Sequence, residues 1–287
     1  MFNIFLVFPF LISSFLAGLA SSITGGIIGS YVVVKRIVFI TGSIAHSVLG
    51  GMGFFLWLKR SYGWTFLDPL EGALLAAILS ALLIGWIHLR YQEREDTIIA
   101  AIWSTGMALG VIFISLTPGY NVELMNFLFG NILWVSQKDL LLLGGLTAVV
   151  ILIALIFHQK FQAVCFDEVE SELRGIPVTF YYLLLLNLVA ISVVILIQVV
   201  GSILVISMLT IPPAIANQFF HKLSAMMLGS IVCGLIFTTT GLAISFFFNL
   251  PPGATIALIS AIAYTLHLIY HGLKKKSGST SSTVTLS

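Results

Sequence analysis

Residues 37–58 read IVFITGSIAHSVLGGMGFFLWL, an apolar stretch in which His46 is the one ionisable side chain. Lysine and arginine stand directly outside it, in the pairs 35–36 and 59–60. A helix that crosses the hydrocarbon core of a bilayer needs about 20 apolar residues. The stretch therefore predicts a transmembrane helix, and similar stretches recur along the chain.

The composition of the whole chain agrees with this interpretation. Only 8 % of the 287 residues are charged, 59 % are hydrophobic, and the mean hydropathy is +1.11. A soluble domain carries about 25 % charged residues, so a soluble fold of this sequence would expose a large apolar surface and aggregate. The composition excludes a soluble domain and predicts an all-α, polytopic transmembrane helix bundle.

Uninterrupted apolar stretches predict eight or nine spans. They run roughly over residues 4–33, 37–58, 69–89, 97–117, 139–158, 177–199, 201–220, 224–248 and 252–271. The number stays open because the first stretch is long and rich in glycine, and because Pro212 and Pro213 could divide the seventh into two half-helices. We expect residues 1–276 to form one transmembrane domain and residues 277–287, which are polar and low in complexity, to form a disordered cytoplasmic tail.

The basic residues lie mainly on one side of these spans. One side collects ten of them: Lys35, Arg36, Arg90, Arg94, Lys160, Arg174, Lys222, Lys274, Lys275 and Lys276. The other side collects three, Lys59, Arg60 and Lys138. Cytoplasmic loops are enriched in lysine and arginine. We therefore expect a multi-pass protein of the cytoplasmic membrane, with its N-terminus outside the cell and its C-terminus in the cytoplasm.

Two connecting segments differ from short turns. The outer segment 118–138 suits a short helix in the membrane interface, with Tyr120 and Trp134 at headgroup depth. In the inner segment 159–177, the spacing over Asp167–Arg174 predicts a short amphipathic helix, with acids in its first turn and Gly175 after its end. On composition alone this helix is either a docking element or a solvated connector.

His46 lies on a face of its span that is almost bare of side-chain bulk. Gly42 and Ser43 precede it by about one helical turn, and Gly50 follows it by one turn. Small residues allow a second helix to approach closely, with His46 hydrogen-bonded across the contact. Alternatively the bare face lines a polar pathway and His46 is a ligand within it. The residues alone leave both interpretations open.

The sequence lacks the motifs of several enzyme classes. It has no Walker A loop, nucleophile elbow, Cys-x-x-Cys pair or His-Glu-x-x-His motif, and no His, Asp, Glu or Cys cluster with metal-ligand spacing. We therefore expect no cofactor on this chain and no nucleic-acid partner. If the chain takes part in ATP-driven transport, a separate subunit must bind the ATP.

Four segments resemble the metal-transporting ABC permeases of the zinc, manganese and iron type, the ABC-3 family. They are YVVVKRIVFITGSIAHSVLGG (31–51), NVELMNFLFGNILWVSQKDL (121–140), CFDEVESELRGIP (165–177) and VVGSILVISMLTIPPAIANQF (199–219). They occur in the family's order and at its separations. The resemblance covers most of the chain from about residue 25 to 255.

This resemblance implies the membrane-spanning permease of a bacterial ABC importer, which forms a homodimer in the inner membrane and moves a divalent metal cation. A cytoplasmic ATPase and an extracytoplasmic metal-binding protein would complete the system. The resemblance assigns His46 to the metal pathway. It assigns coupling to the ATPase to Asp167, Glu168, Glu170, Glu172, Arg174 and Gly175, and leaves Gly42, Ser43, Gly50, Pro212 and Pro213 as pathway or packing residues.

One departure from the family concerns Gly42, which stands where the family commonly has an aspartate one turn before the histidine. A carboxylate and an imidazole there could hold a cation together, and glycine contributes no ligand, so the identity of the ion stays open. The alternatives are a permease for a siderophore, haem or cobalamin and, in a different class, a polytopic membrane enzyme or a scaffold.

Overall fold

The structure, a computed structural model, describes residues 4–90, 95–119, 127, 130, 132 and 135–280. Within these ranges, side chains are described from residue 12 to residue 270, except that of residue 95. Throughout these ranges the regular structure is helical. The helices are α1 (Ile4–Lys35), α2 (Val38–Ser61), α3 (Pro69–Arg90), α4 (Glu95–Leu116), α6 (Gln137–Phe166), α7 (Glu168–Leu173), α8 (Val178–Val200), α9 (Ser202–Phe219), α10 (Leu223–Phe248) and α11 (Pro252–Thr280).

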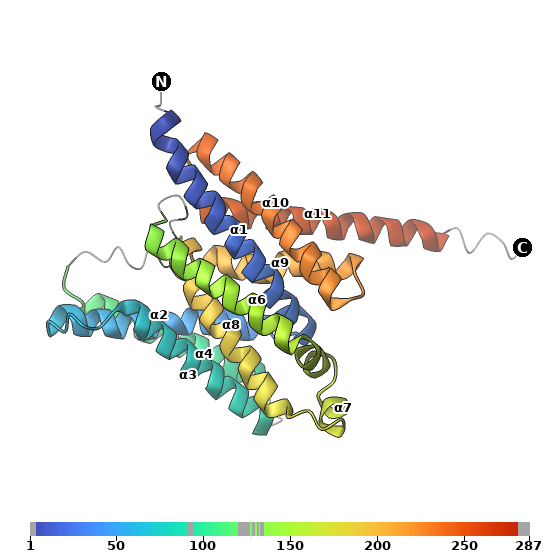
Figure 1. Ribbon diagram of the computed structural model, residues 1–287, viewed down its shortest axis with the longest axis horizontal. Coiled ribbons are helices and arrows are strands. Elements are labelled where there is room, and N and C mark those ends of the chain that lie inside the picture. The colour runs from blue at the N-terminus through green and yellow to red at the C-terminus, as the bar shows by residue number, and fades with distance from the viewer. Residues whose placement is uncertain are drawn as a thin grey trace, which may run out of the picture.

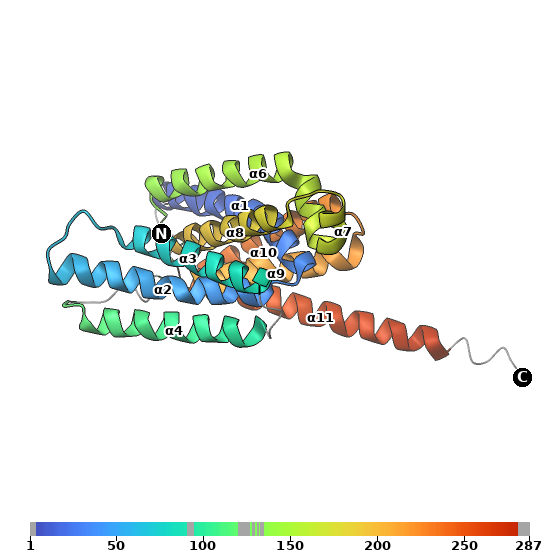
Figure 2. The same ribbon diagram turned by 90° about the horizontal axis from the view of Figure 1, so that it is seen from below.

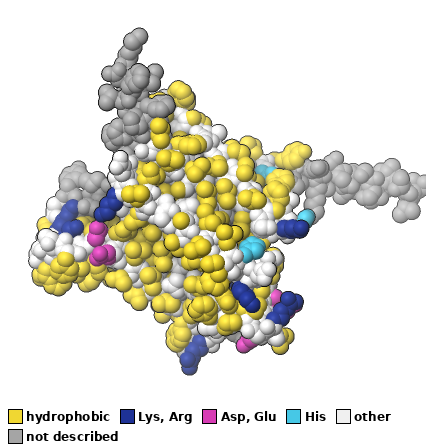
Figure 3. All heavy atoms as spheres, viewed as in Figure 1, with side chains coloured by type: hydrophobic (Ala, Val, Ile, Leu, Met, Phe, Trp, Pro, Cys, Tyr) yellow, Lys and Arg dark blue, Asp and Glu magenta, His cyan; other side chains and the backbone are white. Residues whose placement is uncertain are grey.

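Within the described part of the chain, nine helices are long and apolar enough to cross a membrane, and they coincide with the nine predicted spans. The prediction of an all-α transmembrane bundle is confirmed. The first and seventh spans, which the sequence left open, are each one continuous helix, α1 and α9. On the face shown in Figure 3, hydrophobic side chains cover the middle and charged side chains gather towards the ends, as a membrane protein requires.

Three expectations differ from the structure or lie partly outside the described residues. Helix α6 continues to Phe166, past the predicted end of its span at residue 158, so the first part of the expected inner connection 159–177, including Cys165, is helical. Helix α11 continues to Thr280, and the rest of the expected tail, 281–287, lies outside the described residues. Most of the expected outer interfacial segment, including Tyr120 and Trp134, also lies outside them.

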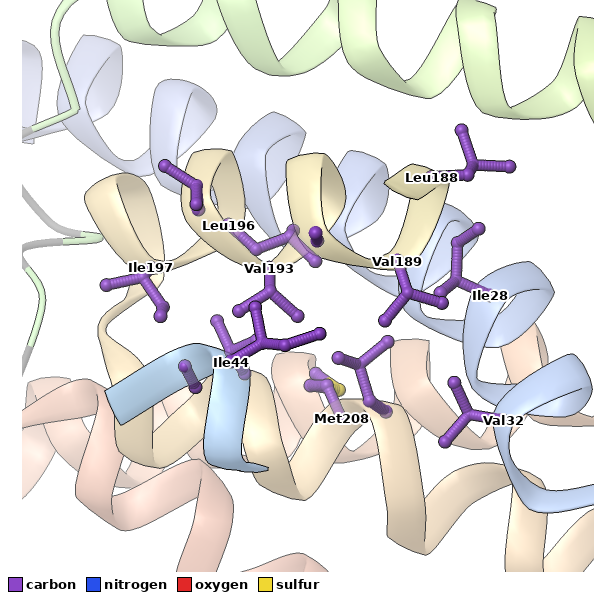
Figure 4. Close-up of a cluster of buried hydrophobic side chains, with 14 of the residues drawn as sticks. Ile28, Val32, Ile44, Leu188, Val189, Val193, Leu196, Ile197 and Met208 are labelled. Carbon is purple, nitrogen blue, oxygen red and sulfur yellow. The ribbon is translucent and has the colours of Figure 1, made fainter. Parts of the chain in front are cut away.

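Helix α8 is the central element of the bundle. It packs against α3 and α6, and also meets α1, α2 and α9 (Figures 1 and 2). Its sequence is apolar on every side, which is typical of a helix surrounded by others. Figure 4 shows Val189 and Val193 of α8 beside Ile28 of α1, Ile44 of α2 and Met208 of α9. This core fixes α2 on one side of the bundle and α1 on the other.

Pro212 and Pro213 lie inside α9 and are both buried. A proline has no N–H, so these two leave the carbonyl groups of Met208 and Leu209 without their helical donors. Helix α1 passes these carbonyls at two glycines: a Cβ added to Gly25 would lie 3.5 Å from the Met208 oxygen, and one added to Gly29 only 2.4 Å from the Leu209 oxygen. The α1 backbone thus covers the carbonyls that the prolines leave free.

We predict that Gly29→Ala destabilises the protein, because the new methyl group would overlap the Leu209 carbonyl and Pro213. Overpacking of this kind costs about 1–3 kcal/mol of unfolding free energy, measurable as a lower Tm in detergent. Gly144→Ala is the matched control, since nothing lies within 4 Å of a Cβ built there. Equal melting temperatures for the two variants would contradict this account of the α1–α9 contact.

Candidate functional site

His46 lies in the middle of α2, and its ring is half-buried against α4. Its imidazole stacks on the indole of Trp103, with the ring centroids 4.5 Å apart and the planes inclined by 14°. Two flat rings in this arrangement gain more than the burial of their area alone. The contact gives the imidazole a defined orientation on the α4 side of α2.

Gly42 lies one turn before His46 and faces the same indole. A Cβ built on Gly42 would lie 3.4 Å from the nearest Trp103 carbon, an ordinary van der Waals contact. The side chain missing at this position is therefore replaced by the ring of Trp103. A Cβ at position 42 meets only two ring carbons of this one side chain.

Ser43 and Gly50 both serve the contact between α2 and α4. Ser43 is fully buried and donates a hydrogen bond of 3.0 Å to the carbonyl oxygen of Ile99. A Cβ on Gly50 would lie 2.9 Å from the carbonyl oxygen of Gly106. Close backbone approach through small residues, with hydroxyl groups bonded across the interface, is how membrane helices associate. The bare face of α2 is thus in contact with α4 above and below His46.

A second hydroxyl contact joins α2 to α3. Ser47, the residue after His46, accepts a hydrogen bond of 2.9 Å from Ser80 of α3, and itself donates to the carbonyl oxygen of Ile44. Ser47 is buried. His46 therefore lies on a helix that is held by polar contacts on two sides.

The predicted amphipathic helix over Asp167–Arg174 is present as α7 (Glu168–Leu173). The Asp167 side chain caps its N-terminus by accepting from the Glu170 N–H at 2.9 Å. Gly175, with φ +74°, follows its last residues, as the sequence predicted. On the surface, Arg174 pairs with Glu170 one turn earlier, and Glu172 is exposed.

Two large apolar side chains of α7 point away from the protein. Val169 is 70 % exposed and Leu173 is 84 % exposed. They are four residues apart and so share one face of the helix. A short helix that joins two spans and presents apolar side chains at its free surface has the form of a docking element.

Glu168 differs from the other acids of α7 because it faces inward. Its carboxylate lies 2.5 Å from Nζ of Lys35, at the end of α1, and 3.5 Å from Nε2 of His88, near the end of α3. The hydrogen bond with His88 and the interaction with Lys35 hold the pKa of the Glu168 carboxyl at about 2, although partial burial opposes them. An ionised carboxylate only accepts hydrogen bonds, so Nε2 of His88 donates.

The surroundings of this ion pair come from two further helices. Lys35 also donates to the carbonyl oxygen of Val164 on α6 at 3.1 Å, and its Nζ lies 5.6 Å from the ring centroid of Tyr182 on α8. The His88 ring lies 4.6 Å from the same tyrosine ring. From the sequence, Lys35 counted only toward the orientation of the spans, and His88 was not among the candidate residues. The one feature of the sequence that could have indicated Lys35 and His88 was their position as a charged or titratable residue in the last turn of a span.

Pro212 and Pro213 have a different setting from the His46 group. The neighbours of these two prolines described above are on α1, so the prolines belong to a packing contact within the core. In the described part of the chain, no three His, Cys, Asp or Glu side chains come close enough to hold a metal ion together. A cation at His46 would therefore need ligands beyond the ionisable side chains of the described residues in one protomer.

Comparison with known proteins places this geometry in a family. The chain is 48 % identical over 263 residues to a Chlamydia pneumoniae protein described as a "probable metal transport system membrane protein", covering 91 % of this chain and 89 % of that protein. It is 30 % identical to the manganese transport system membrane protein MntC of Listeria monocytogenes, over 92 % of this chain and 91 % of the other.

Among solved structures, the fold matches a chain of PsaBC from Streptococcus pneumoniae in complex with Fab. The TM-score is 0.78, the identity is 30 %, and the match covers 90 % of each chain. The ABC 3 transport family matches residues 7–271, which span almost all of the helical bundle. The chain therefore belongs to the ABC 3 transport family, as the four sequence segments indicated.

Proposed function

We propose that this chain is the membrane-spanning permease of an ATP-driven importer of a divalent metal cation. The observation that carries the proposal is α7, a capped helix between two spans with the exposed apolar face Val169–Leu173. Family membership and the metal-transport names of relatives supply the class of substrate. Since the sequence has no nucleotide-binding motif, a cytoplasmic ATPase that docks on α7 supplies the energy.

The permease works as a homodimer with the pathway at the subunit interface. Helices α4 and α11 support this arrangement. Only 17 % and 22 % of the residues in their most apolar stretches are buried in one protomer. Figure 2 shows both helices along the same edge of the bundle, with α6 at the opposite edge. A partner subunit on this edge would cover α4 on the side away from α2 and would bring a second copy of His46 to the pathway.

Transport then follows from alternating access. An extracytoplasmic metal-binding protein delivers the cation to the outer mouth of the dimer, where ligands from the protein replace part of its water shell. The imidazole of His46 is such a ligand, because neutral histidine binds transition-metal cations well. ATP binding and hydrolysis move α7, and the bundles change between outward-facing and inward-facing states. The manganese transporters among the relatives make Mn²⁺ the first cation to test.

The docking role of α7 predicts the behaviour of Leu173→Asp. A carboxylate in an apolar contact leaves an uncompensated charge at the interface, so we expect the ATPase to be lost from the purified complex. His221→Ala, a change at an exposed loop residue outside α7, is the control and should retain the ATPase. Co-purification from membranes gives the measurement. Full retention of the ATPase by the Leu173 variant would exclude this surface as the docking site.

The pathway role of His46 predicts that His46→Ala abolishes uptake of Mn²⁺ by cells or proteoliposomes while the complex still assembles. Its ring is only half-buried and stacks on Trp103, so its loss should leave the fold intact. The measurement is isotope uptake, together with size-exclusion chromatography of the complex. Wild-type uptake by the variant would remove His46 from the pathway.

Gly42 offers a gain-of-ligand test. Because a Cβ at this position meets Trp103 at 3.4 Å, Gly42→Asp should fold and place a carboxylate one turn from His46. Oxygen ligands favour Mn²⁺, so we expect at least about tenfold tighter Mn²⁺ binding by the complex, a change of about 1.4 kcal/mol. Gly42→Asn carries an uncharged side chain of the same shape and should gain much less. Equal affinities of all three forms would place position 42 outside the cation site.

A further inference from the structure

Helix α7 has few contacts that would transmit its movement. It packs against the ends of α6 and α8, the helices on either side of it in sequence. Beside it lies a cavity of about 860 Å³ lined by residues that include His88, Glu168 and Pro177. Of its three acidic side chains, Glu168 is the one bonded to distant helices. Glu170 pairs with Arg174, the residue that follows the helix, and Glu172 is exposed.

The first partner of Glu168 leads to the start of α2. Lys35 is the last residue of α1, and α2 begins at Val38 after a tight turn in which Arg36 has φ +63°. The Lys35 side chain is only 13 % exposed. An ammonium group in such a position is costly to leave unpaired, so the contact favours joint movement of the two helices over separation.

The second partner leads to α2 next to His46. His88 lies on α3, eight residues after Ser80, which is about 12 Å along a helix that rises 1.5 Å per residue. Ser80 donates to Ser47, the residue that follows His46. Helix α3 is one unbroken helix from Pro69 to Arg90. It therefore joins the Glu168 contact at one end to the neighbourhood of His46 in its middle.

We propose that Glu168 is the positioning residue that passes the movement of α7 to α2, through Lys35 at the approach to α2 and through His88, Ser80 and Ser47 along α3. The inference rests on the proposed function and adds a division of labour within α7. Val169 and Leu173 face the ATPase, and Glu168 faces the spans. ATP hydrolysis then alters the setting of the helix that carries His46 through two contacts that share one carboxylate.

The electrostatics suit a link that persists through the transport cycle. With a pKa of about 2, the Glu168 carboxyl is ionised throughout the physiological range. The carboxylate is therefore present to accept from both Lys35 and His88 throughout this range. Hydrogen bonds to charged groups are stronger than those between neutral groups, so this contact can stay formed while the helices move.

The test uses the complete complex, with its ATPase and metal-binding protein, in proteoliposomes, where Mn²⁺ uptake and ATP hydrolysis are measured together. Glu168→Gln keeps the size of the side chain and removes its charge. We expect the ratio of Mn²⁺ transported to ATP hydrolysed to fall about tenfold, with the ATPase still bound. Ser80→Ala, which cuts the link between α3 and α2, should lower the same ratio about fivefold.

Two further variants separate this role from a structural one. Asp96→Asn removes an exposed carboxylate at the same end of the bundle and should leave the ratio unchanged. The charge exchange Lys35→Glu with Glu168→Lys restores the ion pair with α1 but leaves His88 without its acceptor, so it should recover only part of the ratio relative to either single change. If Glu168→Gln proves too unstable to purify, Ser80→Ala decides the matter, because an unchanged ratio in that variant would overturn the route through α3.

The remaining outcomes distinguish the inference from the proposed function. A wild-type complex that binds the ATPase but takes up no Mn²⁺ or other divalent cation contradicts the proposed function, and the inference with it. A wild-type complex that transports, while Glu168→Gln transports with an unchanged ratio, overturns the inference alone. Loss of the ATPase from the Glu168→Gln complex would also overturn it, by making Glu168 part of the docking surface.

Discussion

Hydrocarbon offers no partner for a polar group, and the architecture of this chain follows from that constraint. Every span is a helix because a helix satisfies its own backbone groups. The exceptions are informative. Pro212 and Pro213 free two carbonyls of α9, and α1 covers them at Gly25 and Gly29. Many buried hydroxyl groups bond to backbone carbonyls or to another hydroxyl; the buried Ser47, for example, donates to Ile44 and accepts from Ser80. Helix–helix contacts in the bundle are thus determined by where small residues permit approach and where polar groups need a partner.

Features that depend on neighbours in sequence could be predicted, and features that depend on distant helices could not. The spans follow from runs of about 20 apolar residues, and the α7 helix and the turn at Gly175 follow from residues within one or two turns of each other. The stacking of Trp103 on His46 joins α2 to α4, and the Glu168 contacts join α7 to α1 and α3. No spacing in the sequence encodes those distances. The four acids of segment 167–174 look equivalent in sequence, and only the fold shows that Glu168 faces inward.

Helix α2 is the element on which the proposed mechanism depends, and the packing explains why it can move as a unit. Its contacts with α4 run through glycine backbones and Ser43, and its contact with α3 includes Ser47. Packed interfaces of this kind have few alternative arrangements, so a displacement at one end is transmitted rather than absorbed. The central helix α8 provides the fixed core against which α2 and α3 pack.

The proposed role of His46 as a metal ligand also has a consequence for the chemistry of transport. A transported cation must bind well enough to leave water and weakly enough to leave the protein. With Gly42 in place of a carboxylate, the described part of one protomer supplies no cluster of three ionisable ligands. In the proposed homodimer, two copies of His46 and water that the cation retains would form a site of low charge and low affinity. Such a site would release its ion readily, and selectivity would then depend on the proposed metal-binding protein that delivers the cation.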